Sequence, residues 1–154
     1  MPFKINISEK DGRTFHLETE GENLMEKSLG EKIGGKDIAP ELEGYELEIA
    51  GASDKAGFPS LEKVDGIILK RVLLTYGTGM RKRTRREGKK KRSNMKPKGL
   101  KLRKTVRGKI ISPEIVQINL KVLKQGNKPL AEIFPEQNKP KEKKQEVKAE
   151  VAAQ

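Results

Sequence analysis

The chain has 154 residues, of which 33% are hydrophobic and 36% are charged, and its formal net charge is +12. This composition has too few apolar residues for a chain that is packed throughout, so we expect one small domain with solvated or partner-bound extensions. The absence of cysteine excludes a disulfide framework and a thiolate zinc site.

The sequence also lacks the signals of secretion and membrane insertion. The amino-terminal stretch MPFKINISEKDG has no apolar run of the kind found in a signal peptide. No apolar run in the chain approaches the ~20 residues that span a bilayer. We therefore expect a soluble, intracellular protein.

The first predicted element is a β-hairpin over residues 3–17. Apolar and polar residues alternate in 3–7 and again in 14–17, which is the period of a half-buried strand. The pair Asp11-Gly12 between them is a strong signal for a hairpin turn. The chain is therefore expected to open with two antiparallel strands.

Residues 21–44 predict only short structure, because five glycines interrupt any long helix. We expect a helical turn at 22–27 and a break at Pro40. Residues 45–49 alternate again and predict a strand. The stretch GASDKAGFP at 51–59 is expected to be a loop.

The sequence IILKRVLLT at 67–75 predicts a central strand, which the glycines of YGTG at 76–79 should end. The segment 81–109 follows, and its glycines and proline disfavour a long helix. We expect irregular structure there, with short helices at most.

The clearest predicted strand covers residues 116–122, where apolar and polar residues alternate strictly. A turn is expected at 125–127, and residues 129–134 predict a short helix or a capping segment. From Pro135 the sequence is rich in Lys and Glu and almost free of apolar residues, which predicts a flexible tail.

These elements predict a mainly β protein with a small β-barrel-like domain or sandwich. The domain is expected in two parts, residues 1–80 and 110–134. Residues 81–109 form a basic arm, irregular to partly helical, that is inserted between them, and residues 135–154 form the tail.

The basic arm holds sixteen Lys or Arg residues and a single acid, Glu87, whereas residues 1–80 carry more acids than bases. Such a segment repels itself and has little apolar surface to bury, so it requires a polyanionic partner. We expect that partner to be nucleic acid, where each neutralised phosphate releases counterions. The predicted RNA-binding residues of the arm are Arg81, Lys82, Arg83, Arg85, Arg86, Lys89, Lys90, Lys91, Arg92, Lys96, Lys98, Lys101, Arg103, Lys104, Arg107 and Lys109.

Other partners fit the arm less well. A localisation signal would account for KKKR but not for the length of the arm or its place inside a domain. A membrane surface would require an apolar face beside the charges. Duplex DNA favours a regular helix or ribbon, whereas RNA offers an irregular surface that an extended basic chain can follow.

No catalytic or metal-binding arrangement is visible in the sequence. His16 is the only histidine, and it lies in a predicted strand. The glycine-rich stretches lack the spacing of a phosphate loop or a dinucleotide fingerprint. We therefore expect no enzyme activity, no cofactor, no metal and no small-molecule substrate.

Several motifs together resemble the S6e family of small-subunit ribosomal proteins, in its archaeal branch. The resemblance covers roughly residues 2–134, and EIVQINLKVLKQGNKPL within it is similar to the archaeal members. The other matching residues are Gly51, Asp54, Lys55, Gly57, Phe58 and Pro59 in GASDKAGFP; Arg71, Val72, Leu73 and Leu74; the stretch from Arg81 to Arg92; and Lys104, Val106, Arg107 and Gly108.

The resemblance implies a structural constituent of the small subunit in the cytoplasmic ribosome, with ribosomal RNA and neighbouring ribosomal proteins as partners. It also implies that Lys55 meets phosphate and that Phe58 either stacks on a partner or packs in the domain. Three departures are Ser60, where the family usually has Met; the stretch SNMKPKGLKL at 93–102, which looks like an insertion; and the absence of serine after Ser112, so phosphorylation is not carried over.

Two alternative functions remain at this point. A free RNA-binding regulator or RNA chaperone would have the same basic arm, but would not stay with small subunits during sucrose-gradient fractionation. An RNA-modifying enzyme would require a clustered acid, base or metal site.

Overall fold

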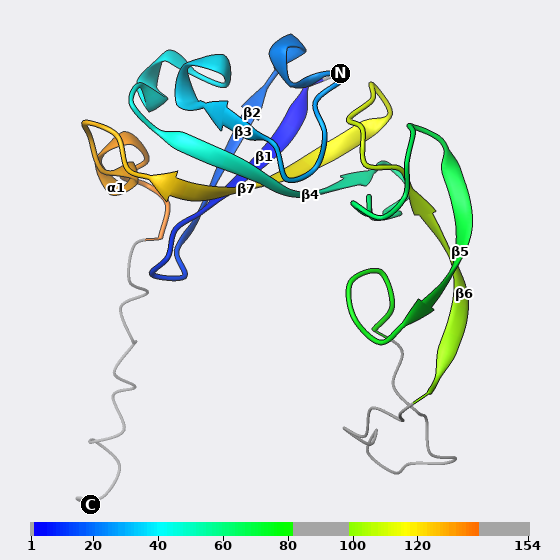
Figure 1. Cartoon of the computed structure of the whole chain (residues 1–154). Coiled ribbons are helices and arrows are strands. Elements are labelled where there is room, and N and C mark those ends of the chain that lie inside the picture. The colour runs from blue at the N-terminus through cyan, green and yellow to red at the C-terminus, as the bar shows by residue number, and fades with distance from the viewer. Residues whose placement is uncertain (1, 82–98, 139–154) are drawn as a thin grey trace, which may run out of the picture.

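The protein is mostly β, as expected, and consists of a five-stranded sheet and a separate two-stranded ribbon (Figure 1). The computed structural model describes residues 2–81 and 99–138. Within these residues the large sheet is open, with β2 and β3 at its edges, rather than closed into a barrel. The elements are β1 (Phe3–Ser8), β2 (Thr14–Thr19), β3 (Lys32–Gly34), β4 (Glu46–Asp54), β5 (Leu69–Thr75), β6 (Lys101–Arg107), β7 (Ile115–Lys124), helix α1 (Leu130–Ile133) and the 3-10 turns Glu22–Leu24, Gly35–Asp37 and Pro40–Leu42.

Near the centre of the sheet, β1 pairs with β7, although the two strands are far apart in the sequence. The strand order is β2-β1-β7-β4-β3, and β1 runs parallel to β7 while the other neighbours are antiparallel. Ile5 lies opposite Ile118 and Ile7 lies opposite Leu120, and all four side chains are buried. The predicted hairpin and the strand at 116–122 are confirmed, because their alternating apolar residues line one face of this sheet.

The core lies between that face and the short turns. Leu24, Leu42 and Leu130 come from two 3-10 turns and from α1, and each is fully buried in the same cluster as the sheet residues. Figure 1 shows the 3-10 turns together on one side of the sheet. The sequence between 21 and 44 thus supplies a cover for the sheet although it contains no long helix.

The loop expected at 51–59 is only partly a loop. Residues 51–54 continue β4 and pair with β7, after a register shift between Ile49 and Gly51. Glycine in this strand marks the irregularity rather than the end of pairing, because Gly51 remains opposite Asn119. The turn itself follows Asp54, where Gly57 has a φ of +84°.

The strand expected at 67–75 forms, but it is not central. As β5 it pairs with β6 and belongs to no larger sheet among the described residues. The prediction assumed burial on both faces, whereas Leu69 and Leu73 are exposed. Residues 101–107 form β6 in place of the irregular structure expected for the whole of 81–109, because pairing with β5 satisfies the backbone groups that face that strand, while the side chains of Lys101, Arg103 and Lys104 stay in water.

The first residues of the expected tail are attached to the edge strand β2. The Gln137 side chain accepts a hydrogen bond from the His16 backbone N–H at 2.7 Å and donates one to the His16 carbonyl at 2.8 Å. The Asn138 side chain donates to the Thr14 carbonyl at 2.9 Å. Two amide side chains thus occupy backbone groups that an edge strand would otherwise expose. Residues 139–154 of the predicted tail lie outside the described residues.

The buried Tyr45 ties the start of β4 to the segment before α1, and removal of its hydroxyl is expected to weaken that link. Its side chain is 2% exposed and donates a hydrogen bond to the Lys128 carbonyl. We expect Tyr45→Phe to lower the free energy of unfolding by about 1 kcal/mol, the usual contribution of one such bond. Urea denaturation followed by circular dichroism measures the difference.

High pH provides an internal check on the same variant. Burial, with a smaller contribution from the negative charge of Glu9, raises the pKa of Tyr45 above its ordinary value of 10.0. Above that pH the unfolded chain releases the tyrosine proton while the folded chain retains it, so the folded state loses stability as pH rises. The stability advantage of the wild type over Tyr45→Phe should therefore shrink above pH 10; an advantage that grows would contradict this account.

Candidate nucleic-acid interface

The β5–β6 ribbon has one face packed on the rest of the protein. Val106 and Met80 are fully buried there, and Val72, Leu74 and Leu102 are half-buried. A Cβ atom placed on Gly79 would lie 3.0 Å from Leu74 Cδ1 and 3.7 Å from both Pro59 Cγ and Val106 Cγ1. These apolar side chains therefore meet at residue 79 and fix the base of the ribbon.

The start of the basic segment is fixed by a tight turn after β5. The backbone N–H of Gly77 donates to the Met80 carbonyl at 2.9 Å, and that of Met80 donates to the Gly77 carbonyl at 3.1 Å. Gly79 has a φ of +80°, which a residue with a side chain rarely adopts. The segment therefore leaves the domain from the buried Met80 and returns at β6.

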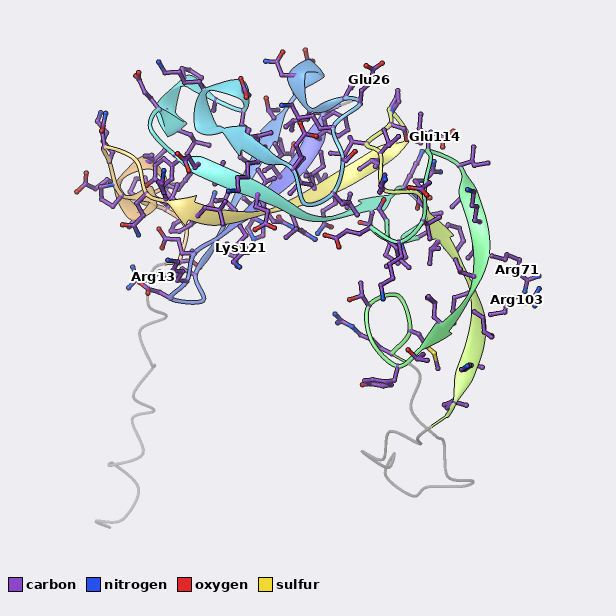
Figure 2. The ribbon with its side chains drawn as sticks, in the orientation of Figure 1. Arg13, Glu26, Arg71, Arg103, Glu114 and Lys121 are labelled. Atoms are coloured by element: carbon purple, nitrogen blue, oxygen red, sulfur yellow. The ribbon has the colours of Figure 1, made fainter. Side chains whose placement is uncertain are left out.

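Several cations of the ribbon face solvent. Among the described residues none of them has a carboxylate within ion-pair distance. Figure 2 shows Arg71 and Arg103 side by side, both pointing away from the five-stranded sheet. The exposed cations of this group are Arg71, Arg81, Lys101, Arg103 and Lys104.

Arg71 was not among the predicted RNA-binding residues. It lies in the strand that was expected to be central in a sheet, where a charged side chain has no evident partner. The strand register shows that Arg71 is a cross-strand neighbour of Arg103, because Arg71 lies opposite Thr105 and Arg103 lies opposite Leu73 on the neighbouring strand. The sequence signal that could have identified Arg71 is the alternation of faces along the strand: Val72 and Leu74 lie on one face, and Arg71 lies on the other.

Lys55 lies at the exposed tip of the turn that follows β4. The Asp54 carboxylate holds this turn by accepting a hydrogen bond from the Phe58 backbone N–H at 2.9 Å, and Asp54 N–H donates to the Phe58 carbonyl at 3.1 Å. Phe58 is half-buried and lines a pocket beside Leu69 and Pro113. Lys55 is therefore accessible to a partner, and the Phe58 ring contributes to the protein's own packing.

Arg107 does not take part in the exposed surface. Its side chain is 6% exposed, and both Nε and Nη2 lie 3.3 Å from Asp54 Oδ2. Nη1 donates to the Ile67 carbonyl at 3.3 Å and forms an ion pair with Glu114. Arg107 therefore fastens β6 to the end of β4, and we leave it out of the interface. Composition does not distinguish Arg107 from the exposed arginines, although Arg107 stands between the apolar Val106 and Gly108.

The residues after Arg107 are also engaged within the protein. Lys109 Nζ lies 2.7 Å from Asp65 Oδ1, and this hydrogen-bonded ion pair lowers the pKa of Asp65 below its ordinary value. A Cβ atom on Gly108 would lie 1.8 Å from the Gly66 carbonyl oxygen, so two backbone segments touch there. The cations at the carboxyl end of the predicted basic arm thus pair within the protein, and those without an ion pair among the described residues end at Lys104.

The remaining predicted RNA-binding residues lie outside the described residues. They are Lys82, Arg83, Arg85, Arg86, Lys89, Lys90, Lys91, Arg92, Lys96 and Lys98. In residues 2–81 and 99–138, no three His, Asp or Glu side chains gather as metal ligands. Over the same residues, no helix has the length and apolar content needed to cross a membrane.

Comparison with known proteins gives one consistent result. A family model described as "Ribosomal protein S6e" matches residues 3–135. "Small ribosomal subunit protein eS6" of Methanococcus maripaludis (strain C5) is 40% identical over 131 residues, covering 84% of this chain and 94% of that protein. The proteins of the same name from Archaeoglobus fulgidus and Nanoarchaeum equitans are 40% and 37% identical, covering 87% and 86% of this chain and 96% and 90% of their own lengths.

Proposed function

The chain belongs to the ribosomal protein S6e family, and on that premise we propose that it is a structural component of the small ribosomal subunit that binds ribosomal RNA. The relatives carry the name of the small subunit, and the family is one of ribosomal structural proteins rather than enzymes. Its place would be the cytoplasmic ribosome, among ribosomal RNA and neighbouring ribosomal proteins. The protein itself would require no cofactor.

The observation that carries the RNA-binding proposal is a basic segment that is held at both of its ends by the packed ribbon. Residues 81–104 contain fourteen Lys or Arg residues and one acid. Both ends of this segment emerge from a ribbon that is packed on the domain, with Met80 buried at one end and β6 paired at the other. A segment fixed at both ends loses less conformational entropy on binding than a free tail of the same charge.

The interface we propose combines this segment with the exposed cations beside it. Arginine side chains bind phosphate through two parallel hydrogen bonds, and lysine side chains supply point charges. Neutralised phosphates release counterions, which provides affinity without base recognition. The proposed RNA-binding residues among those described are Lys55, Arg71, Arg81, Lys101, Arg103 and Lys104.

Charge neutralisation in this segment is expected to flatten the salt dependence of RNA binding. Each Gln substitution at Arg81, Arg83, Arg85 or Arg86 should reduce the slope of log K against log salt by about 0.7–0.9, and the fourfold variant should lose about three. Filter binding of ribosomal RNA from the small subunit, repeated at several salt concentrations, measures the slope.

A matched control is available at the far hairpin. Lys10 and Arg13 are exposed in the turn between β1 and β2, and Figure 2 shows Arg13 well away from the ribbon. The double variant Lys10→Gln, Arg13→Gln removes two charges and should leave the slope unchanged. An affinity that does not depend on salt, or an equal loss of slope in the control, would refute the proposed interface.

A further inference from the structure

The ribbon exposes a cluster of large apolar side chains. Among the described residues five large hydrophobic side chains are exposed, and four of them fall between positions 67 and 73. The exposed fractions are 66% for Ile68, 56% for Leu73, 45% for Ile67 and 43% for Leu69. Scattered apolar residues are ordinary on a protein surface, but a contiguous group of this kind marks an interaction site.

Part of this cluster shares one face with cations. Leu69, Arg71 and Leu73 alternate on β5 and so point to the same side of the ribbon. Arg103 lies opposite Leu73, and Lys101 lies two residues before it on β6. We call this surface the outer ribbon face; it comprises Leu69, Arg71, Leu73, Lys101 and Arg103, with Ile67 and Ile68 at one end. Figure 2 shows its two arginines directed away from the large sheet.

We propose that the outer ribbon face docks a neighbouring protein of the small subunit whose contact surface combines apolar side chains with Asp or Glu residues. This inference rests on the proposed function. Arg71, Lys101 and Arg103 also belong to the proposed RNA interface, so the partner protein and ribosomal RNA would meet along this face, with the protein covering its apolar side chains. Residues 66–81 and 99–109 contain no acid, and among the described residues neither Arg71 nor Arg103 has a carboxylate within ion-pair distance, so acidic side chains of a partner can pair with these arginines. Interfaces typically combine an apolar centre with arginines of this kind.

RNA is a poor partner for the apolar part of this face. Proteins bind exposed bases by stacking aromatic rings or guanidinium planes on them, and phosphates by hydrogen bonds. Residues 66–75 contain no aromatic side chain. Aliphatic side chains gain most from contact with other apolar groups, at about 25 cal/mol per Å² removed from water.

Residues 82–98 of the chain do not suit this face either. Residues 82–98 contain ten Lys or Arg residues and only one large apolar residue, Met95. This sequence would be repelled by Arg71 and Arg103. A second copy of the chain in a symmetric contact would bring the same arginines together, which like-charge repulsion opposes.

Photo-crosslinking in intact small subunits tests the partner class. Benzoylphenylalanine is placed at position 73, at position 81 as a reporter of RNA contact, and at position 25 as a control. Met25 is 37% exposed and lies outside the ribbon. We expect position 73 to crosslink one small-subunit protein, identified by mass spectrometry, at a segment with apolar and acidic residues.

The other outcomes overturn the inference or separate it from the proposed function. Crosslinks from position 73 to RNA alone, to a second copy of this chain, or to no macromolecule overturn the protein-docking proposal. A protein crosslink at position 73 with no RNA crosslink at position 81 supports the docking proposal and counts against the proposed RNA interface. A chain that fails to sediment with small subunits overturns both.

A double substitution measures what the apolar cluster contributes. Ile68→Thr with Leu73→Thr keeps strand-forming residues and the charge while removing two apolar contacts. After a high-salt wash, which weakens phosphate contacts, the fraction of chain retained on small subunits should fall about tenfold or more. Met25→Thr should retain as much as the wild type, and affinity for isolated ribosomal RNA should stay within about twofold. Equal retention of the double variant and the wild type would refute the proposal.

Discussion

Replacement of Arg107 by methionine is expected to lower the free energy of unfolding by about 3 kcal/mol. Arg107 and Asp54 are both almost fully buried, and their closest atoms lie 3.3 Å apart. The substitution leaves the Asp54 carboxylate without its guanidinium partner in an apolar setting, and it also removes the hydrogen bond to the Ile67 carbonyl. Urea denaturation followed by circular dichroism measures the loss.

Arg103 supplies the matched control, because it lies on the same strand with its side chain in solvent. Arg103→Met should change the free energy of unfolding by less than about 0.5 kcal/mol. Removal of both partners in Asp54→Leu, Arg107→Met should cost less than the sum of the two single changes, since no charge is then left buried. Equal losses for Arg103→Met and Arg107→Met would mean that the ion pair does not hold the ribbon.

The variant Gly108→Ala is expected to destabilise the protein by about 3 kcal/mol or more. The added methyl group would lie 1.8 Å from the Gly66 carbonyl oxygen and 2.4 Å from its carbon. Both neighbours are backbone atoms, so relief requires the segment after β6 to move away from residues 64–66. That movement also breaks the hydrogen bond from Lys109 N–H to the Val64 carbonyl at 2.8 Å.

Gly34→Ala is the control for the loss of a glycine. A Cβ atom there meets its nearest neighbour, Asp37 Oδ2, at an ordinary 3.8 Å, and the backbone φ is −78°. We expect this variant to stay within about 0.5 kcal/mol of the wild type in the same urea titration. If Gly108→Ala were equally mild, the contact between residues 66 and 108 would not be a constraint on the fold.

Periodicity predicted the parts of the fold whose apolar face meets the core. Residues 3–7, 14–17, 45–49 and 116–122 alternate, and each forms a strand of the large sheet. The short helix near 129–134 and the break at Pro40 were also predicted and confirmed. In these segments the local pattern and the tertiary environment favour the same structure.

The ribbon could not be predicted in the same way. Whether IILKRVLLT is central or peripheral depends on what covers its second face, and a single strand carries no information about that. The strand at 101–107 was not predicted, because the glycines and the proline of 81–109 favoured irregular structure over the whole segment. Pairing with β5 satisfies the backbone of both strands, and β6 buries only its carboxyl end, at Val106 and Arg107.

The cations of the candidate site were proposed from composition alone. A count of cations locates a basic segment but does not distinguish Arg103, in solvent, from Arg107, buried against Asp54. That distinction depends on a contact between residues 53 positions apart. The resemblance to a family named Asp54 and Arg107 as shared residues, and the structure supplies a physical reason for both, namely the ion pair between β4 and β6.

The parallel pairing of β1 with β7 has a consequence for the order of events during synthesis. The first strand of the chain finds its inner neighbour more than a hundred residues later, so the large sheet acquires its middle only after residue 124 has been added. Contacts of such wide sequence separation form slowly. The cationic segment is therefore complete and available to polyanions before the domain that carries it has closed, and the nascent chain exposes an unfinished hydrophobic surface until residue 124 has been added.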